Sequence, residues 1–350
     1  MIQKLKQFHQ LQIGKKHMVS EKDIRPHQLM LDNKALHEED VKILLQRLNN
    51  FVLVNCPACS GNNYQLKFKK NGFNFVECTN CATLYVNPRP SMSMLAEFYS
   101  TSKSIQHWSN IIFPESDQIR YLEIAIPRAE LVIDTCRKYL TSNRVALDIG
   151  SGFGSLCSAL KDHNYFERIV ALELSPDAVR ACRERQIDVI EKSAEELTSL
   201  DIQGVDLITN FELIEHLYDP YSFLMSCFNI LEHNGMIILS TPNIHGFDLQ
   251  TLGALSENID APNHINYFNV SSLNDLLEKI GFHVLQILTP GQLDAEIVRN
   301  QILCGSLNIK DQPFLTDILL TNWSKLGQVF QRFLVENKMS SHMVAIARKP

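Results

Sequence analysis

Residues 145–154 read Val-Ala-Leu-Asp-Ile-Gly-Ser-Gly-Phe-Gly, an apolar run that leads into an acidic residue and three alternating glycines. An amphipathic stretch begins at Ser155, so the pattern predicts a buried strand, a tight glycine turn and a helix. Glycines let backbone N–H groups approach a ligand closely, and the first turn of the following helix is electropositive. The segment therefore predicts a site for a nucleotide-like cofactor.

The next predicted strand narrows the choice of cofactor. Residues 168–173 are apolar up to Glu173, about 20 residues beyond the glycine turn, where an acid can accept both hydroxyls of a ribose. The dinucleotide fingerprint G-x-G-x-x-G would have its third glycine where Ser155 stands. Asp148 would repel a diphosphate and could attract an ammonium group. A ligand with a cationic amino-acid end and a ribose end therefore fits better than NAD.

Four blocks in order resemble the class I S-adenosylmethionine-dependent methyltransferases. The first is the glycine turn with Glu173, and the second is DLITNFELIEHLYDP at residues 206–220. The third is LEHNGMIILSTPN at residues 231–243. The fourth is NHINYFN at residues 263–269, followed by Ser-Leu and Ile-Gly-Phe, and it is similar to a block of sugar and small-molecule methyltransferases. Together they cover roughly Arg144 to Leu288.

The resemblance implies an α/β fold, with a doubly wound, Rossmann-like sheet of seven strands, and S-adenosylmethionine as the methyl donor. Two positions depart from the family pattern. Ser193 stands where an acid often recognises the adenine, so backbone contacts could serve instead, and His233-Asn234 replace a basic residue and a proline in a turn. The implied donor-binding residues are Asp148, Gly150, Ser151, Gly152, Gly154, Glu173, Leu174, Ser193, Ala194, Asn210, Phe211 and Glu212.

Four cysteines form a second motif. Cys56-Pro-Ala-Cys59 and Cys78-Thr-Asn-Cys81 have the C-x2-C-x18-C-x2-C spacing of a tetrahedral structural zinc site. The residues between them alternate as hairpin strands do, around a turn at Asn71-Gly72. A redox or disulfide pair is the alternative. It is disfavoured because the other cysteines fall mostly in apolar periodic segments, as buried free thiols do in a reducing compartment: Cys136, Cys157, Cys182, Cys227 and Cys304.

The cysteine motif is followed by TLYVNPRPS at residues 83–91. A zinc ribbon with this ending, ahead of a methyltransferase core, is similar to methyltransferases of sugar and surface-polysaccharide modification. Ribosomal-RNA guanine methyltransferases with a zinc-binding N-terminus are the competing relatives.

Methyl transfer needs an acceptor atom aligned with the donor, and a hydroxyl or carbon acid also needs a base. His264 is the first candidate base, with Tyr267 beside it on a loop expected beyond the carboxyl ends of the strands. His216, after the fourth strand of the core, is the second. Each of these residues also has a plainer alternative role. His264 could make only a structural hydrogen bond, and His216 could orient its loop. Tyr267 could be a packing residue or part of the wall of the substrate site.

The composition is that of a globular protein with a large and a small domain. The 350 residues are 45% hydrophobic and 21% charged, with a net charge of −6, which argues against a large nucleic-acid surface. No apolar run approaches the ~18 residues of a membrane span. The N-terminal residues lack the apolar core of a signal peptide, so we expect a cytoplasmic protein.

The pattern divides the chain into four parts, namely a polar, locally basic arm and helix at 1–50, the zinc ribbon at 51–91, linking helices at 92–143 and a methyltransferase domain at 144–350. The arm's helix is predicted from Glu38 to Leu48. The linking helices could cover the cofactor mouth. A helical insertion at about 289–341 precedes a last strand, and the helical segments could support oligomers.

The insertion carries three polar residues near its start, Asp294, Glu296 and Arg299. They could bind a polar substrate, and the plainer alternative is a capped, solvated helix start.

These features together predict methyl transfer from S-adenosylmethionine to a small polar metabolite, a sugar or nucleotide-sugar-type intermediate, at oxygen or carbon. The expected partner is that small-molecule substrate, rather than nucleic acid or a membrane. Three alternatives stay open, namely an RNA base methyltransferase, a non-catalytic S-adenosylmethionine-binding scaffold and an NAD-dependent sugar enzyme.

Overall fold

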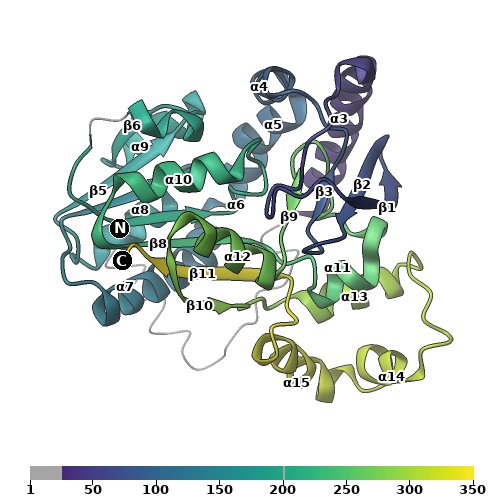
Figure 1. The fold of residues 1–350 in the computed structure, drawn as a ribbon. Helices are drawn as coiled ribbons and strands as arrows, with labels where there is room; N and C mark the ends of the chain where they lie inside the picture. Colours follow the sequence, from purple (N-terminus) through teal and green to yellow (C-terminus); the bar gives the residue numbers. More distant parts are fainter. Residues whose placement is uncertain (1–25, 200–201) are drawn as a thin grey trace.

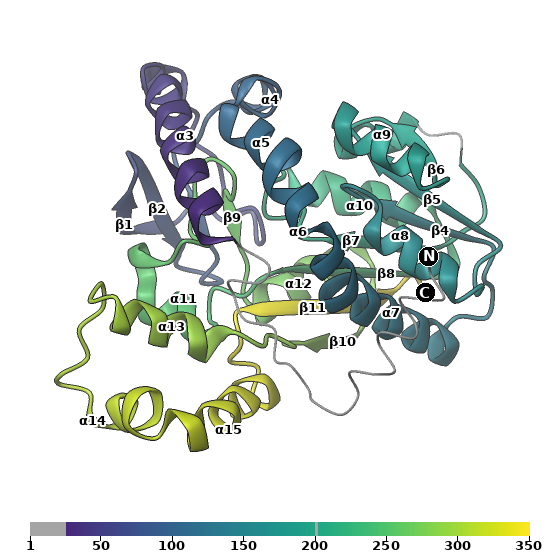
Figure 2. The ribbon, with the colours of Figure 1, turned by 180° about the vertical axis from the view of Figure 1, so that it is seen from behind.

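The computed structural model describes residues 26–199 and 202–350, which form two sheets and the helices around them (Figures 1 and 2). The larger sheet has the strand order β10-β11-β8-β7-β4-β5-β6, and the smaller has the order β1-β2-β3-β9. In both views the smaller sheet and the C-terminal helices α13, α14 and α15 lie on the same side of the larger sheet.

The larger sheet confirms the seven-stranded α/β architecture predicted from the sequence. Only β11 runs against its neighbours, pairing antiparallel with both β8 and β10. Parallel strands are covered on both faces, and β4 is accordingly buried at all five residues. The strands are β4 (Val145–Ile149), β5 (Arg168–Glu173), β6 (Asp188–Glu191), β7 (Val205–Phe211), β8 (Leu231–Pro242), β10 (His283–Leu288) and β11 (His342–Arg348).

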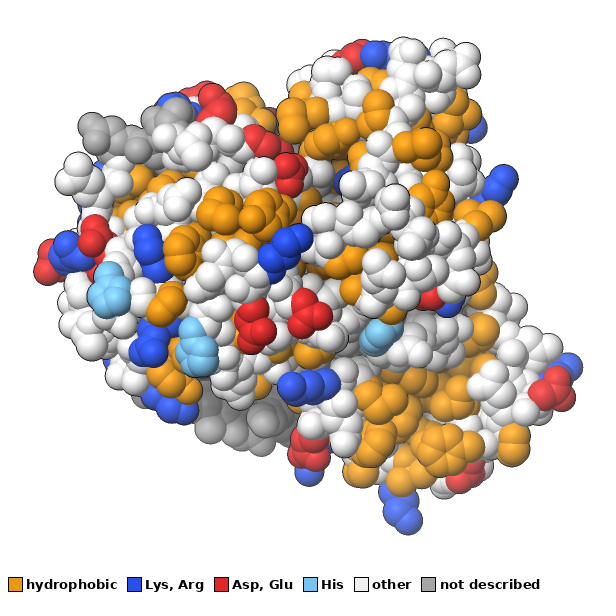
Figure 3. Space-filling view, in the orientation of Figure 1, with side chains coloured by type: hydrophobic (Ala, Val, Ile, Leu, Met, Phe, Trp, Pro, Cys, Tyr) orange, Lys and Arg blue, Asp and Glu red, His pale blue; other side chains and the backbone are white. Residues whose placement is uncertain are grey.

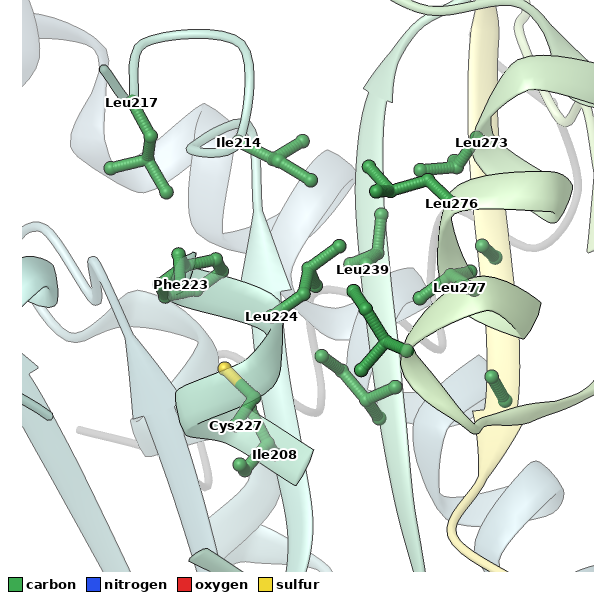
Figure 4. Close-up of a cluster of buried hydrophobic side chains, with 14 of the residues drawn as sticks. Ile208, Ile214, Leu217, Phe223, Leu224, Cys227, Leu239, Leu273, Leu276 and Leu277 are labelled. Carbon is green, nitrogen blue, oxygen red and sulfur yellow. The ribbon is translucent and has the colours of Figure 1, made fainter. Parts of the chain in front are cut away.

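Two helical layers cover this sheet because its side chains alternate between the faces. Ile237 and Leu239 of β8 pack with α10 (Pro220–Ile230) and α12 (Val270–Ile280). Met236 and Ile238 face the opposite layer, with α7 (Ile126–Tyr139) and α8 (Ser155–Asp162). Figure 4 shows side chains of α10, α12 and β8 meeting in the first of these cores. α9 (Pro176–Glu184) packs beside α8 through Cys182 and Cys157.

The smaller sheet joins the cysteine-bearing segment to the core. Its first hairpin turns at Asn71 and Gly72, whose φ values are +49° and +83°, as the predicted Asn-Gly turn requires. Its third strand pairs with β9, which comes nearly two hundred residues later, through Leu84 with Tyr267 and Tyr85 with Asn266. The strands are β1 (Tyr64–Lys70), β2 (Phe73–Cys78), β3 (Leu84–Val86) and β9 (Asn266–Tyr267).

The N-terminal helix α3 spans His27–Leu45, so it begins earlier than the helix predicted over Glu38 to Leu48 and ends sooner. Its buried apolar residues are Val41 and Leu44, in the second half. The first half is largely exposed, so it carries no apolar pattern by which the sequence could reveal it. Residues 1–25 of the predicted arm lie outside the described residues.

Short helices connect the cysteine-bearing segment to the large sheet. They are α4 (Met92–Thr101), α5 (Lys103–His107) and α6 (Phe113–Arg120), with π-helical turns at Trp108–Ile112 and Tyr121–Ala125. Shorter 3-10 turns occur at Leu48–Asn50, Ala194–Ser199 and Gly253–Leu255.

The segment before β11 is helical. α13 (Asp294–Leu303), α14 (Pro313–Thr316), a π turn at Asp317–Thr321 and α15 (Trp323–Glu336) enclose a small core with α11 (Phe247–Leu252). Figure 3 shows hydrophobic side chains gathered over this region, where Phe314, Val329 and Phe333 are exposed. Within residues 26–199 and 202–350, none of the helices combines the length and the hydropathy needed to cross a bilayer.

Candidate functional site

The glycine turn lies at the carboxyl end of β4, between that strand and α8. Gly150, Gly152 and Gly154 have φ values of +71°, +53° and +74°, a region that disfavours side chains. A Cβ on Gly154 would lie 2.5 Å from Ile187, whereas no described atom lies within 4 Å of a Cβ built on Gly152. The backbone at Gly152 is therefore open to an approaching ligand.

Glu173, at the end of β5, is tied to this turn. One carboxylate oxygen accepts a hydrogen bond from Gly152 N at 2.8 Å. The other accepts from Leu174 N and Ser175 N, both at 2.9 Å. The acid is thus held at the edge of the turn by backbone amides, beside the open space at Gly152.

Asp148 lies below the turn and is 4% exposed. Its carboxylate accepts from Thr209 Oγ1 at 2.7 Å and from Cys157 Sγ at 3.4 Å. Burial raises the pKa of Asp148 to about 6, although Thr209 and Cys157 oppose that rise. The carboxyl group therefore titrates near neutral pH.

Helix α6 lies against the glycine turn. Phe113 stacks on Phe153 with ring centroids 4.0 Å apart. Asp117 accepts from Arg185 Nη2 at 2.7 Å and from Ser155 Oγ at 3.4 Å. Helix α6 thus covers one side of the glycine turn.

A cavity of about 800 Å³ opens beyond the carboxyl ends of β7 and β8. Its wall combines residues of α3, α4, α7, the loops after β7 and β8, and the start of α13. The polar groups that bear on chemistry are Tyr99, Arg128, Glu212, His216, Asp260 and His264. Ligands of open α/β sheets bind at this edge, so the cavity and the glycine turn share the functional side of the fold.

Glu212 directly follows β7 and lies in the left-handed region, with φ +54°. Its carboxylate accepts from Ser240 Oγ at 2.5 Å and lies 3.2 Å from His342 Nδ1 and 3.8 Å from Arg128 Nη2. Burial alone would raise the pKa of Glu212, but His342, Arg128 and Ser240 hold it below its usual value. The cavity therefore contains a carboxylate and a guanidinium, and Arg128 also lies over the Phe211 ring at 4.8 Å.

His216 and His264 lie side by side in the cavity wall, with ring centroids 4.7 Å apart. His264 Nδ1 is 3.0 Å from Asn258 O, and His216 Nδ1 is 3.2 Å from the Tyr99 hydroxyl. Burial and, to a smaller extent, the neighbouring His264 lower the pKa of His216 to about 3, so His216 is neutral. The two candidate bases from different blocks are thus neighbours.

Tyr267, the third candidate for catalysis, lies beside His264 but is not among the residues that line the cavity. Its side chain is fully buried in β9, and its hydroxyl accepts from Asp260 N at 2.9 Å. That hydroxyl also lies 3.3 Å from Asn258 O and His264 O, either of which can accept its proton. Since the group is occupied and buried, the structure favours the packing alternative, with Tyr267 supporting the loop that carries His264.

The four motif cysteines come together as two matched knuckles. Ser60 N donates to Cys56 O and Ala82 N to Cys78 O, each at 2.9 Å, and Ser60 and Ala82 both have positive φ. The Cys56–Cys81 and Cys59–Cys78 Sγ distances are 3.5 Å, and all four thiols lie within 4.8 Å of one another. These distances exclude disulfides, while four sulfurs ~2.3 Å from one zinc ion would be about 3.8 Å apart.

Residues 121–287 match the family model described as a methyltransferase domain. A probable S-adenosylmethionine-dependent methyltransferase of Mycolicibacterium smegmatis is 31% identical over 145 residues, covering 41% of this chain and 53% of that protein. A ubiquinone biosynthesis O-methyltransferase of Xanthomonas campestris is 30% identical over 103 residues, covering 28% and 42%. The chain thus spans about half, or less, of the length of these relatives.

Among solved structures, an S-adenosylmethionine-dependent methyltransferase from Archaeoglobus fulgidus aligns with 63% of this chain and 94% of its own. The TM-score is 0.42 and the sequence identity is 21%.

The other residues that the sequence predicts to bind the methyl donor lie at the same edge of the sheet. Asn210 is buried and donates to Ile149 O at 3.3 Å, linking β7 to the start of the glycine turn. Ser193 and Ala194 follow β6, and Ser193 N donates to Glu196 Oε2 at 3.0 Å. Leu174 is 57% exposed just beyond Glu173, and Ser151 N donates to Leu172 O.

The sequence reasoning missed Arg128 and Tyr99, which reach the cavity from the linking helices. Both occur in helical patterns that read as ordinary amphipathic segments. The signal for Arg128 was its position within an otherwise apolar helix face, next to the buried residues Ala129 and Val132.

Two of the polar residues near the start of the insertion, Asp294 and Arg299, make contacts within the protein itself. Asp294 is buried and accepts hydrogen bonds from the chain itself, including Ser341 N at 2.6 Å. Arg299 lies over the Trp323 ring at 5.0 Å. Both contacts favour a structural role for these two residues.

Proposed function

We propose that this chain transfers a methyl group from S-adenosylmethionine to a small polar metabolite, a sugar or nucleotide-sugar-type intermediate, at oxygen or carbon. The observation that carries the proposal is the cavity beyond β7 and β8, whose volume of about 800 Å³ suits one small molecule. Its wall holds a carboxylate, a guanidinium and two imidazoles, which suits a ligand with several hydroxyl groups.

The glycine turn and Glu173 fit the donor. Gly152 lets a ligand approach the backbone, and Glu173 lies where an acid can accept ribose hydroxyls. Asp148 adds negative charge near the turn for the amino-acid end of the donor. The bound sulfonium would supply an electrophilic methyl group, so the protein's task is to orient the acceptor and exclude water.

We assign the contacts with the acceptor group of the substrate to His216 and His264. They reach the same cavity from the loop after β7 and the loop before β9. Both lie close enough to act on one acceptor group, because their rings are 4.7 Å apart. We assign them the activation of the acceptor.

The cysteine cluster supports a structural zinc ion. Cys56, Cys59, Cys78 and Cys81 would fill all four positions of a tetrahedral ion, which leaves none for catalysis. Asn269 Nδ2 donates to Cys81 O at 2.8 Å, so the ribbon is fastened to the segment that follows β9. The proposed ion would therefore stabilise the side of the cavity that carries His264.

Donor binding is tested by adding one methyl group to the glycine turn. Gly152→Ala should abolish S-adenosylmethionine binding in calorimetry, because the new Cβ would occupy the space reserved for the ligand. Gly305→Ala is the matched control, since Gly305 also has positive φ and no described atom within 4 Å of its Cβ. Undiminished binding in Gly152→Ala would remove the donor site from this turn.

Turnover is tested by S-adenosylhomocysteine release with a panel of nucleotide sugars and with RNA. Release with the sugars, lost in His264→Ala and kept in His283→Ala, is the expected result, because His283 is exposed on β10. If the RNA were methylated and the nucleotide sugars were not, the substrate would be assigned to RNA instead. Donor binding with no release from any acceptor would favour a scaffold.

A further inference from the structure

Three potential metal ligands meet at the wall of the cavity. Glu215, His216 and His264 place one ligand atom each within 4.8 Å of the others. Two backbone hydrogen bonds fix their relative position, because Ile265 N and Asn266 N both donate to the backbone carbonyl oxygen of Glu215, at 3.0 and 3.1 Å. The loop after β7 and the loop before β9 are thus held together at the point where the three side chains meet.

The hydrogen bonds of the two imidazoles set their tautomers. Asn258 O can only accept, so His264 Nδ1 carries the proton of that bond. The Tyr99 hydroxyl donates its proton to Asn263 O at 3.1 Å, so His216 Nδ1 must be the donor to the Tyr99 oxygen. Both rings therefore have their lone pair on Nε2. Metal-binding histidines show this arrangement, with the other ring nitrogen donating to a carbonyl or similar acceptor.

Glu215 provides an independent sign that a cation belongs here. Its side chain is fully buried, and Oε2 accepts from Thr241 Oγ1 at 3.0 Å. Oε1 is buried and has no hydrogen-bond partner among the described residues. A buried carboxylate oxygen without a partner is costly. The nearest guanidinium, Arg128, is directed to Glu212 instead.

We propose that Glu215, His216 and His264 bind a divalent transition-metal ion, separate from the zinc of the ribbon. Two imidazoles and one carboxylate form a ligand set used by zinc and by iron(II), and they leave coordination positions open. Modest side-chain rotations would bring the ligand atoms from their spacing within 4.8 Å to ~2.0–2.2 Å from one ion.

The open positions of the ion would face the cavity, since His216 and His264 line it. This role rests on the proposed methyl transfer. An ion here would bind an acceptor hydroxyl and favour its deprotonated form, with the proton passing to water in the cavity. The substrate class is then narrowed to oxygen acceptors, especially those with a second oxygen that can chelate the ion.

Cobalt distinguishes the two sites because thiolate ligands give an intense charge-transfer band and a histidine–carboxylate site does not. Metal-free full-length protein is titrated with Co2+ under reducing, anaerobic conditions, and bound cobalt is counted by elemental analysis. We expect the thiolate band to saturate at one equivalent and a second equivalent to bind without adding to it. Glu215→Gln and His264→Ala should each lose only the second equivalent, while His283→Ala should keep both.

Binding of a single cobalt with the thiolate band, in the unchanged protein and in all variants alike, would overturn the proposal. A second cobalt that persists in both Glu215→Gln and His264→Ala would also overturn it, because that ion would lie elsewhere. Circular dichroism of the two variants checks that they are folded, and Cys78→Ser identifies the thiolate band. The count of bound cobalt does not depend on turnover, so methyl transfer can fail while the metal site stands, or the reverse.

Discussion

Asp148 shows how one buried carboxyl group makes the stability of the fold depend on pH. Its folded-state pKa is about 6, against an ordinary value of 3.8. Between these pH values the folded protein binds more protons than the unfolded chain, so stability falls as the pH rises through this window and is flat above it. A difference of two pKa units corresponds to roughly 3 kcal/mol.

We therefore predict that Asp148→Asn stabilises the ligand-free protein at pH 8 relative to the unchanged protein, by about 1–3 kcal/mol. The gain should disappear near pH 4, where Asp148 itself is largely protonated. Urea unfolding at a series of pH values measures this difference. An equal effect of the substitution at pH 4 and pH 8 would show that the charge of Asp148 is not the cause.

Single residues also mark the limit of the sequence analysis. The glycine turn, Glu173 and the four cysteines could be predicted because each motif is a local spacing of a few residues. The packing of Tyr267 could not, since its hydroxyl meets Asp260 N and Asn258 O on a loop whose path no periodicity encodes. The same holds for the contact between Tyr99 and His216, which are 117 residues apart.

At the scale of elements, the pairing of β3 with β9 connects the cysteine-bearing segment to the loop that carries His264. Arg89, 2% exposed, lies beyond β3 and donates to Asn266 Oδ1 at 3.1 Å. Asn266 Nδ2 donates to Leu217 O at 2.8 Å, which joins the ribbon, β9 and the loop after β7. The hairpin of the ribbon was predictable, but its fourth strand was not, because β9 is two residues long and far away in sequence.

We predict that Asn266→Ala lowers the free energy of unfolding by about 3 kcal/mol, because it leaves a buried guanidinium and a backbone carbonyl without their partner. Chemical denaturation measures the loss. Asn62→Ala is the matched control, since Asn62 is exposed in the same ribbon. A loss below about 0.5 kcal/mol would mean that β3 and β9 are held together by their backbone alone.

On the scale of the whole molecule, the cavity is lined by one edge of the larger sheet, by α3, α4 and α7, and by the start of α13, whose arrangement Figures 1 and 2 show. The order of the blocks was enough to predict the large sheet, because each strand and helix carries its own pattern. How the insertion closes the cavity depends on contacts between its start and its end. Asp294 at the start of α13 meets Ser340 and Ser341 just before β11, a pairing that no local pattern contains.

Asp294 is the point where this insertion is fastened to the sheet. Its carboxylate accepts from Ser340 Oγ at 2.8 Å, Ser341 N at 2.6 Å and Gln331 Nε2 at 2.6 Å, and it is 2% exposed. Asp294→Ala should therefore loosen α13–α15 from β11 and raise their hydrogen–deuterium exchange, because the buried Ser340 hydroxyl and two partly buried donors lose their acceptor. Calorimetric S-adenosylmethionine affinity should stay unchanged, since the glycine turn lies outside the insertion. Asp311 is exposed in the same segment, so the control variant Asp311→Ala should leave the exchange of α13–α15 unaltered. If Asp294→Ala also left this exchange unaltered, the small core around Val298 and Leu319 would be holding the insertion by itself.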